Sequence, residues 1–141
     1  MTSLSFPDVN VWLALILEHH VHRAAALEWW GETDSAAAFT RFTQMSVLRL
    51  LTTTAAMDGR PVTMEEAWRT YDRLFEDDRV ALYPEPPRVE AQFRQLSQAP
   101  LASPKVWADA YLVAFASGHH GQLVTFDRAL ENRGADCLVL R

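Results

Sequence analysis

Residues 107–127 read WADAYLVAFASGHHGQLVTFD, and this stretch decides the fold class. Its first ten residues are apolar nearly all round, with Asp109 as the exception, which is typical of a helix that has little contact with solvent. The helix is expected to end near Gly118, and the apolar run 123–126 then predicts a buried strand that stops at Asp127. A helix that leads into a buried strand indicates an α/β protein.

The same alternation of strands and helices extends over the rest of the chain. Short strands are predicted at 4–6, 36–39, 80–83, 123–125 and 137–140. Helices are predicted at 10–17, 22–30, 40–51, 63–75, 89–97, around Asp109 to Gly118, and at 127–133. Because strands separated by helices favour a parallel sheet, we expect a three-layer α/β/α architecture with four to five short parallel strands and helices on both faces.

Several helix ends carry recognisable signals. Asn10 is predicted to cap the first helix, and either Thr40 or Thr43 the third, because short polar side chains accept hydrogen bonds from free backbone N–H groups. Thr63 begins a sequence with the form of a capping box, and Gly31 is predicted to stop the second helix. These signals place helices between the strands, as the α/β pattern requires.

The composition limits what kind of protein this is. A chain of 141 residues is most simply one domain, 1–141, and its 22% charged and 49% apolar residues argue against disorder. The net charge of −5 gives no global sign of nucleic-acid binding, although local basic patches matter more than the sum. Cys137 is the single cysteine, and neither a secretory signal nor an apolar run of bilayer length is visible. A cytoplasmic protein without disulfides is therefore expected.

Three carboxylates stand in apolar surroundings, where an unpaired charge is costly unless it is bound to a cation. Asp8 and Asp127 each follow a predicted strand, and Gln44 lies near the start of the helix after strand 36–39. Asp109 lies in the first turns of its helix, with Lys105 as its one basic neighbour a turn away. Since function in parallel sheets gathers at the carboxyl ends of the strands, we expect these side chains to converge there.

Converging carboxylates without matching bases predict a site for Mg²⁺ or Mn²⁺, which prefer carboxylate and water oxygens. Such an ion lowers the pKa of a bound water and neutralises charge on a phosphate, so metal-assisted hydrolysis of a phosphodiester is the expected chemistry. Asn10 and Thr125 are candidates for orienting the carboxylates or the water. Arg41, Lys105 and Arg128 are candidates for contacts with the phosphates of RNA.

The ordered set of these motifs resembles the PIN domain, and specifically the VapC-type ribonuclease toxins of bacterial toxin–antitoxin pairs. Residues 8–10 (DVN) resemble the first motif of that family, and Thr43 with Gln44 occupies the place of its second, a Ser or Thr followed by Glu. Residues 109–114 (DAYLVA) resemble the third motif and 125–128 (TFDR) the fourth. Together the motifs span nearly the whole chain.

The resemblance implies a PIN-like domain with Mg²⁺- or Mn²⁺-dependent endoribonuclease activity. It implies that Asp8, Gln44, Asp109 and Asp127 are catalytic, that the three aspartates hold the metal, and that Thr43 supports them. It also implies a toxin that inhibits growth by cleaving cellular RNA, a cognate antitoxin that neutralises it, and a homodimer. Gln44 departs from the glutamate of most of the family, and an amide brings no negative charge, so metal affinity is expected to be lower.

Two other classes of function compete with this interpretation. A catalytically silent PIN-like module that binds RNA or protein is favoured by Gln44. A receiver domain that accepts a phosphoryl group needs an acidic pair after the first strand, where this chain offers only Asp8, and an aspartate after strand 80–83, which is followed by Pro84 and Glu85. The receiver class is therefore disfavoured, and the silent module stays open.

Each acid also has a structural alternative. Asp8 and Asp127 are both placed to cap a following helix. Asp109 is placed to form an ion pair with Lys105. Only the combination of the acids in motif order favours a site over these alternatives.

The aromatic residues, histidines and cysteine are interpreted structurally. Trp12, Trp68 and Trp107 fit apolar helix faces and are predicted to lie in the core or near it. The adjacent Trp29 and Trp30 cannot both face one core, so one of them is expected at an interface. The runs 19–22 and 119–120 contain histidines that are expected to be solvated loop residues rather than zinc ligands, and Cys137 is expected in the core.

Overall fold

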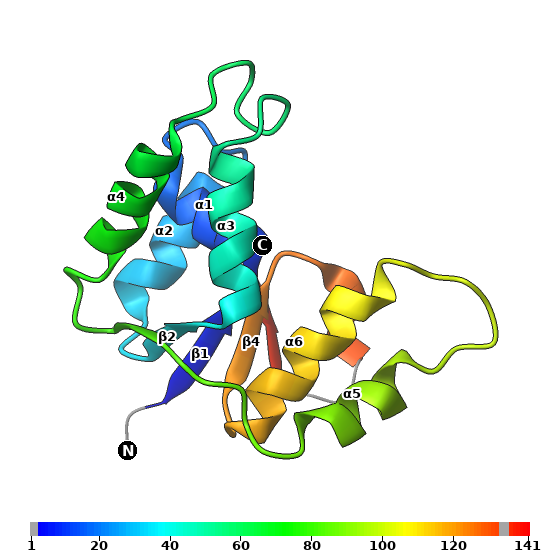
Figure 1. The fold of residues 1–141 in the computed structure, drawn as a ribbon. Helices are drawn as coiled ribbons and strands as arrows, with labels where there is room; N and C mark the ends of the chain where they lie inside the picture. Colours follow the sequence, from blue (N-terminus) through cyan, green and yellow to red (C-terminus); the bar gives the residue numbers. More distant parts are fainter. Residues whose placement is uncertain (1–2, 133–135) are drawn as a thin grey trace.

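The computed structural model describes residues 3–132 and 136–141, so the predicted helix end at Arg133 lies outside the described residues. A sheet of five parallel strands in the order β3-β2-β1-β4-β5 forms the centre of the fold (Figure 1). The strands are β1 (Leu4–Pro7), β2 (Ala36–Phe39), β3 (Val80–Leu82), β4 (Gln122–Thr125) and β5 (Cys137–Val139). The predicted parallel sheet is confirmed.

Helices cover both faces of this sheet. They are α1 (Val9–Ile16), α2 (Arg23–Glu32), α3 (Arg41–Leu51), α4 (Met64–Leu74), α5 (Val89–Ser97) and α6 (Val106–Gly118), with a 3₁₀ helix η1 (Arg128–Asn132). Figure 1 shows α1 to α4 on one side of the sheet and α5 with α6 on the other. The expected three-layer α/β/α arrangement is therefore confirmed.

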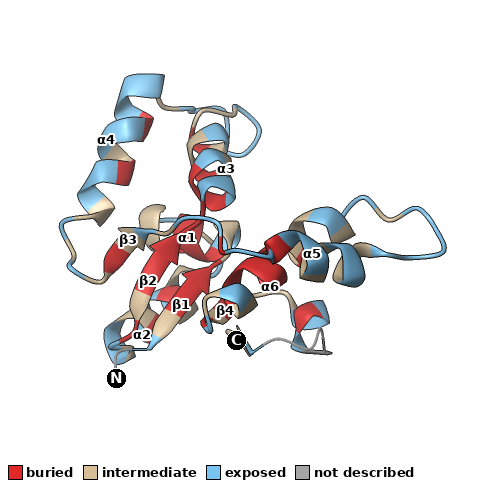
Figure 2. Cartoon of the chain, turned by 60° about the horizontal axis from the view of Figure 1, so that its bottom comes forward, coloured by how far each residue is buried: buried red, intermediate tan, exposed pale blue. Residues whose placement is uncertain are grey.

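The central strands β1, β2 and β4 are buried on both faces because their side chains alternate between two hydrophobic layers. In β2, Ala37 and Phe39 pack with α1, α3 and α4, whereas Ala38 packs with α6. In β4, Leu123 packs against α6 and Val124 against α1 and α2. The buried strands and the exposed outer faces of α4 and α5 are visible in Figure 2.

The helix caps correct two expectations and confirm two. Asp8, not Asn10, caps α1, because Asp8 Oδ1 accepts a hydrogen bond from the backbone N–H of Val11. Thr40 caps α3, with Thr43 as its reciprocal partner, and Thr63 caps α4. The expectation that Gly31 stops α2 is wrong. The positive φ that makes a glycine a helix stop is absent there, and α2 continues to Glu32.

The tryptophans are distributed differently from the prediction. Trp12 is fully buried and stacks on Phe39 at a centroid distance of 3.9 Å, as expected of a core residue. Trp68 and Trp107 are 48% and 59% exposed, so their assignment to the core is wrong. An apolar stripe on a helix predicts one buried face, but it does not show how far a large ring extends past the edge of that face.

Trp29 and Trp30 both pack against hydrophobic residues of the same chain. Trp29 is buried against Val11 and Val124, and Trp30 is half-buried between two hydrophobic clusters. The guanidinium of Arg79 lies 3.7 Å from the centre of the Trp30 ring. The two rings therefore contact neighbouring clusters of the same chain, and the interface expected at this pair stays a prediction.

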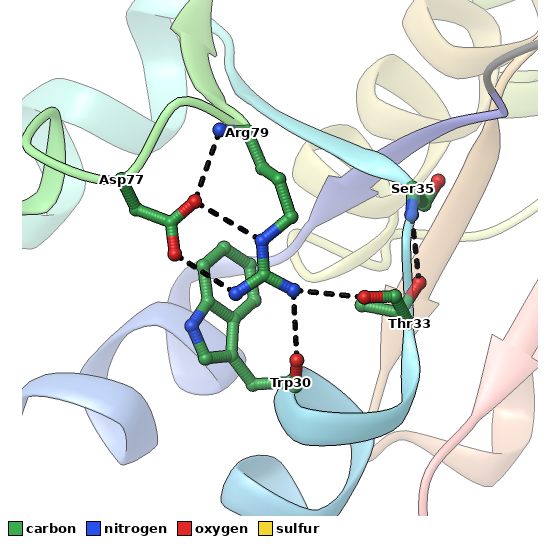
Figure 3. A network of polar contacts seen from close by, with 5 residues as sticks. All are labelled: Trp30, Thr33, Ser35, Asp77 and Arg79. Carbon is green, nitrogen blue, oxygen red and sulfur yellow. Dashed lines mark hydrogen bonds and ion pairs between the residues drawn. The ribbon is translucent and has the colours of Figure 1, made fainter.

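Arg79 joins the turn before β3 to the end of α2 (Figure 3). Its Nη1 donates to the carbonyl oxygens of Trp30 and Thr33, both at 2.8 Å, and Nε and Nη2 donate to Asp77. The last carbonyls of a helix lack partners within the helix, so Arg79 satisfies groups that water would otherwise have to reach. The ion pair raises the pKa of Arg79 and lowers that of Asp77.

Gly121→Ala is expected to destabilise the protein by about 1–3 kcal/mol, because there is no room for a methyl group at this position. A Cβ at Gly121 would lie 2.8 Å from Phe6 Cε2 and 3.0 Å from the carbonyl oxygen of Leu4. Urea unfolding measures the change. Gly31→Ala is the matched control: nothing lies within 4 Å of its Cβ position. A helical alanine there should stabilise by about 0.5–1 kcal/mol. Equal effects of the two substitutions would contradict the close packing at Gly121.

Within the described ranges, no helix combines the length and the apolar character that crossing a membrane requires.

Candidate active site

Asp8 lies where β1 meets α1, at the carboxyl edge of the sheet. Its backbone N–H donates to the carbonyl of Val124 at 2.9 Å, which extends the pairing of β1 with β4 by one residue. Oδ1 accepts from the N–H of Val11 at 3.1 Å, and Oδ2 accepts a short hydrogen bond from Thr125 Oγ1. The carboxylate is therefore held at both oxygens and cannot turn away from the edge.

Thr125 links Asp8 to Asp127 through one buried hydroxyl group. Thr125 Oγ1 donates to Asp8 and accepts from the backbone N–H of Asp127 at 3.0 Å. Asp127 Oδ1 accepts from the N–H of Ala129, in the first turn of η1, at 2.9 Å. This acid therefore caps a short helix in addition to lying at the edge. Asp8, Thr125 and Asp127 thus form one connected group at the ends of two neighbouring strands.

Asp109 approaches the same edge from the first turn of α6. Burial raises the pKa of Asp8 above its ordinary value, and the nearby negative charge of Asp109 adds to that rise. Hydrogen bonds from Thr125 and from the backbone of Val11 and Asn10 offset part of it. The two carboxylates therefore repel one another electrostatically, and a cation between them would relieve the repulsion.

Three basic residues lie around this edge of the sheet: Lys105, Arg128 and Arg41. Lys105 pairs with Asp127, with 3.2 Å between Nζ and Oδ2, and its side chain stays largely exposed. Arg128 is exposed at the start of η1. Arg41 is exposed at the start of α3, two strands away from Asp127 in the sheet order. Lys105 and Arg128 flank the acids, and Arg41 lies on the side toward β3.

Gln44 is buried in α3 and is held by two partners. Its Oε1 accepts from Arg41 Nη1 at 2.7 Å, and its side chain hydrogen-bonds Tyr71 of α4. Burial raises the pKa of Tyr71, while this hydrogen bond and Arg41 lower it in part. Gln44 thus connects α4 to the start of α3, a role that its place after strand β2 did not indicate.

Thr43 and Asn10 are the other residues predicted to support the acids, and both take part in the hydrogen bonds of helix caps. Thr43 is buried and exchanges hydrogen bonds with Thr40, each 2.9 Å long between a backbone nitrogen and a hydroxyl oxygen. Asn10 is exposed, and it is its backbone N–H that donates to Asp8. Thr125 is therefore the candidate supporting residue whose side chain contacts an acid directly.

A hard cation fits the oxygen donors at this edge. Among residues 3–132 and 136–141, no three His, Cys, Asp or Glu side chains are already placed to ligate one ion. Mg²⁺ keeps several of its waters and is commonly bound through one or two carboxylates, so a complete protein cage is not required. Asp8 and Asp109 are the two acids whose negative charges repel each other, and Asp127 is connected to Asp8 through Thr125.

Two of the histidines, His119 and His22, contact aromatic rings of the chain. His119 packs against Phe6, Tyr83 and Phe115, and its Nε2 lies 2.7 Å from the carbonyl oxygen of Pro84, to which it donates. His22 stacks on Phe126 with 4.4 Å between ring centroids. The expectation of a solvated loop residue is wrong for His119, whose half-buried imidazole ring packs as an aromatic surface, and it is confirmed for His22, which stays exposed in the turn before α2.

Comparison with known proteins points to one family. The family described as "PIN domain" matches residues 5–135 of this chain. The chain is 42% identical over 133 residues to Ribonuclease VapC41 of Mycobacterium tuberculosis, an alignment that covers 90% of this chain and 91% of the relative. It is 29% identical over 135 residues to Ribonuclease VapC29 of the same species, covering 94% and 92%.

Solved structures show the same fold at low sequence identity. Mycobacterium tuberculosis VapC20, described as a sarcin–ricin loop cleaving toxin, superimposes with a TM-score of 0.66 at 15% identity, covering 93% of this chain and 95% of that one. A chain of VapBC2 from Rickettsia felis, bound to a DNA fragment from its promoter, gives 0.68 at 12% identity, covering 98% and 99%. These likenesses support the architecture of sheet and helices described above.

Proposed function

This chain belongs to the PIN domain family and is similar over nearly its whole length to VapC ribonucleases, and on that premise we propose that it is a metal-dependent endoribonuclease. Its acids Asp8, Asp109 and Asp127 serve the cleavage of RNA, with Asp8 and Asp109 as the principal holders of Mg²⁺ or Mn²⁺. The observation that supports this proposal most strongly is the burial and fixed orientation of the Asp8 carboxylate. Burial and a neighbouring acid penalise this carboxylate, yet it is held rigidly at both oxygens.

The bound ion would supply an activated water and neutralise the charge that develops on the phosphate. The chain's own residues would orient the reaction. Thr125 and the N–H of Val11 fix the direction of the Asp8 carboxylate. Lys105 and Arg128, at the rim beside Asp127, carry the positive charge that attracts the RNA backbone.

A cognate antitoxin and a growth-inhibiting toxin role are part of the same proposal. Two of the structural neighbours are complexes named VapBC2 and FitAB, each bound to DNA. By analogy we propose that this chain pairs with an antitoxin that blocks the acidic edge, and that two copies form a homodimer. If a neighbouring reading frame encodes such an antitoxin, its co-expression should abolish the growth inhibition that this chain causes.

RNA cleavage with and without metal tests the central activity. We expect cleavage of a folded RNA in the presence of Mn²⁺ or Mg²⁺, none in EDTA, and none by Asp109→Asn with any metal. The rival is a silent module, which is favoured by the engagement of Gln44 with Arg41 and Tyr71. Retained RNA binding without cleavage in any metal would favour that rival.

Gln44→Glu is expected to tighten Mn²⁺ binding, by about fivefold, because a carboxylate near the site adds attraction that the protein interior screens only in part. Arg41 would neutralise part of the new charge, which keeps the effect modest. Calorimetric titration of the metal-free protein measures the change, and Gln98→Glu, at the exposed residue that directly follows α5, is the control. An unchanged affinity would show that the side chain at position 44 points away from the ion.

A further inference from the structure

A second feature lies at the same edge of the sheet, where β2 and β3 end. A cavity of about 390 Å³ opens between the loop after β3, the first residue of α3 and the edge of the face by which α6 packs on the sheet. Tyr111, which lines it, follows Asp109 by two residues on α6, and Arg41, which also lines it, begins the helix that carries Gln44. The backbone N–H of Tyr83 donates to the carbonyl of Phe39, so the loop is fixed against the end of β2.

Two charged groups of opposite sign face this cavity, and each is held by a neighbour. Glu85 Oε2 accepts from the hydroxyl of Tyr111 at 2.8 Å, which leaves Oε1 available to a ligand. Arg41 Nη1 donates to Gln44 at 2.7 Å, which leaves its Nε and Nη2 donors available.

The rest of the lining is largely aromatic. The half-buried Tyr83 and Tyr111 contribute ring surface, and the buried Phe115 backs the Tyr111 ring, with 5.9 Å between the ring centroids. Flat apolar walls with a few fixed polar groups are typical of sites for planar ligands. In single-stranded RNA the unstacked bases are recognised in this way, by stacking on aromatic side chains and by hydrogen bonds to their edges.

We propose that this cavity binds a guanine base of the RNA next to the site of cleavage. Arg41 donates to guanine O6 and N7, and Glu85 accepts from guanine N1–H and the N2 amino group. Adenine presents an amino group to Arg41 where guanine presents O6, so it is disfavoured, and cytosine offers Glu85 a single donor group. Gln44 is then a positioning residue, since it holds Arg41 in place. The inference rests on the proposed function for its substrate class.

Binding of short single-stranded RNAs tests the proposal without cleavage. The RNAs are uridine oligomers that differ only at one central base, which is G, A or C, and their binding to the full chain is followed by fluorescence anisotropy in EDTA. We expect the G-containing RNA to bind about tenfold more tightly than the other two. Equal affinities, no binding at all, or a preference for A or C would overturn the assignment. Guanosine monophosphate that binds as tightly as the oligomer would overturn the assignment to RNA.

Two matched variants locate the preference. Glu85→Gln should remove the preference for G, because an amide no longer accepts from both donor groups of guanine. Glu90→Gln should retain it, because Glu90 is exposed on α5 and pairs with Arg94 away from the cavity. A preference that survives Glu85→Gln would contradict the proposed contact.

The outcome is independent of the ribonuclease test. If the chain cleaves RNA with Mn²⁺ but shows no preference for G in EDTA, the proposed function stands and the guanine site falls. If it prefers G in EDTA but cleaves no RNA with any metal, the guanine site stands and the nuclease assignment falls.

Discussion

Asp8→Asn is expected to lower the rate of Mn²⁺-dependent RNA cleavage by about a thousandfold, because the loss of a metal carboxylate removes several kcal/mol of charge stabilisation. Asparagine is as good an N-cap as aspartate, so the hydrogen bond to Val11 that begins α1 is kept. The loss is therefore one of chemistry and not of folding. Cleavage of a labelled RNA under single-turnover conditions measures it.

The same variant should be more stable than the wild-type chain when both are free of metal at neutral pH. Burial raises the pKa of Asp8 above its ordinary value of 3.8, so the folded state holds this proton more tightly than the unfolded state does. As pH rises from 3.8 through the folded pKa, the ionised carboxylate costs the folded state free energy, and the free energy of unfolding falls. Asparagine cannot ionise and escapes this loss, so the difference should vanish below pH 3.8.

Asp34→Asn is the control for both measurements, since Asp34 is exposed in the connection before β2. It should change neither cleavage nor, to any large extent, the free energy of unfolding at neutral pH. Wild-type cleavage by Asp8→Asn would show that this acid does not serve the reaction. A metal-free Asp8→Asn protein that is less stable at neutral pH would show that the hydrogen bonds of the carboxylate outweigh its burial.

Arg79→Met is expected to destabilise the folded state by about 2 kcal/mol, chiefly because the carbonyls of Trp30 and Thr33 lose a charged donor. The contact with the Trp30 ring contributes up to about 1 kcal/mol of this, since a guanidinium over an indole is attracted by its electrons. The ion pair with Asp77 adds little, because both side chains are part-exposed and solvent screens it. Urea unfolding at neutral pH measures the sum.

Two further substitutions separate the contributions. Arg79→Lys should recover less than half of the loss, because an ammonium group cannot reach both carbonyls and the carboxylate with one planar fork. Arg69→Met removes an ion pair of exposed residues on α4 and should change stability by less than about 0.5 kcal/mol. If Arg79→Met were as mild as Arg69→Met, the connection between α2 and β3 shown in Figure 3 would not stabilise the fold.

The strands and most helices could be predicted from the sequence because buried apolar residues recur with the period of a strand or of a helix. The helix predicted at 89–97 coincides with α5, and β2 coincides with the run 36–39. Single residues at the boundaries were harder. Asp8 and Asn10 both have the chemistry of a cap, and only the backbone conformation decides between them. Gly31 shows the same limit, since a glycine stops a helix only where its φ is positive.

The order of the acids along the chain could be predicted, but their partners could not. Lys105 is one helical turn from Asp109 in sequence, yet it pairs with Asp127, which β4 brings to the same edge. The partners of Gln44, and the pairing of Tyr111 with Glu85, join helices to segments that are distant in sequence. Contacts of this kind depend on how helices pack over the sheet, and no local pattern encodes them. The same holds for Arg79, which carried no motif.

Direct titration of the metal-free protein with Mn²⁺, followed by calorimetry, tests most directly whether the carboxyl edge of this sheet is a metal site. One saturable site is expected in the wild-type chain, with at least a tenfold loss of affinity in Asp8→Asn and in Asp109→Asn and no change in Asp34→Asn. Identical isotherms for the wild-type chain and the two site variants would contradict the account.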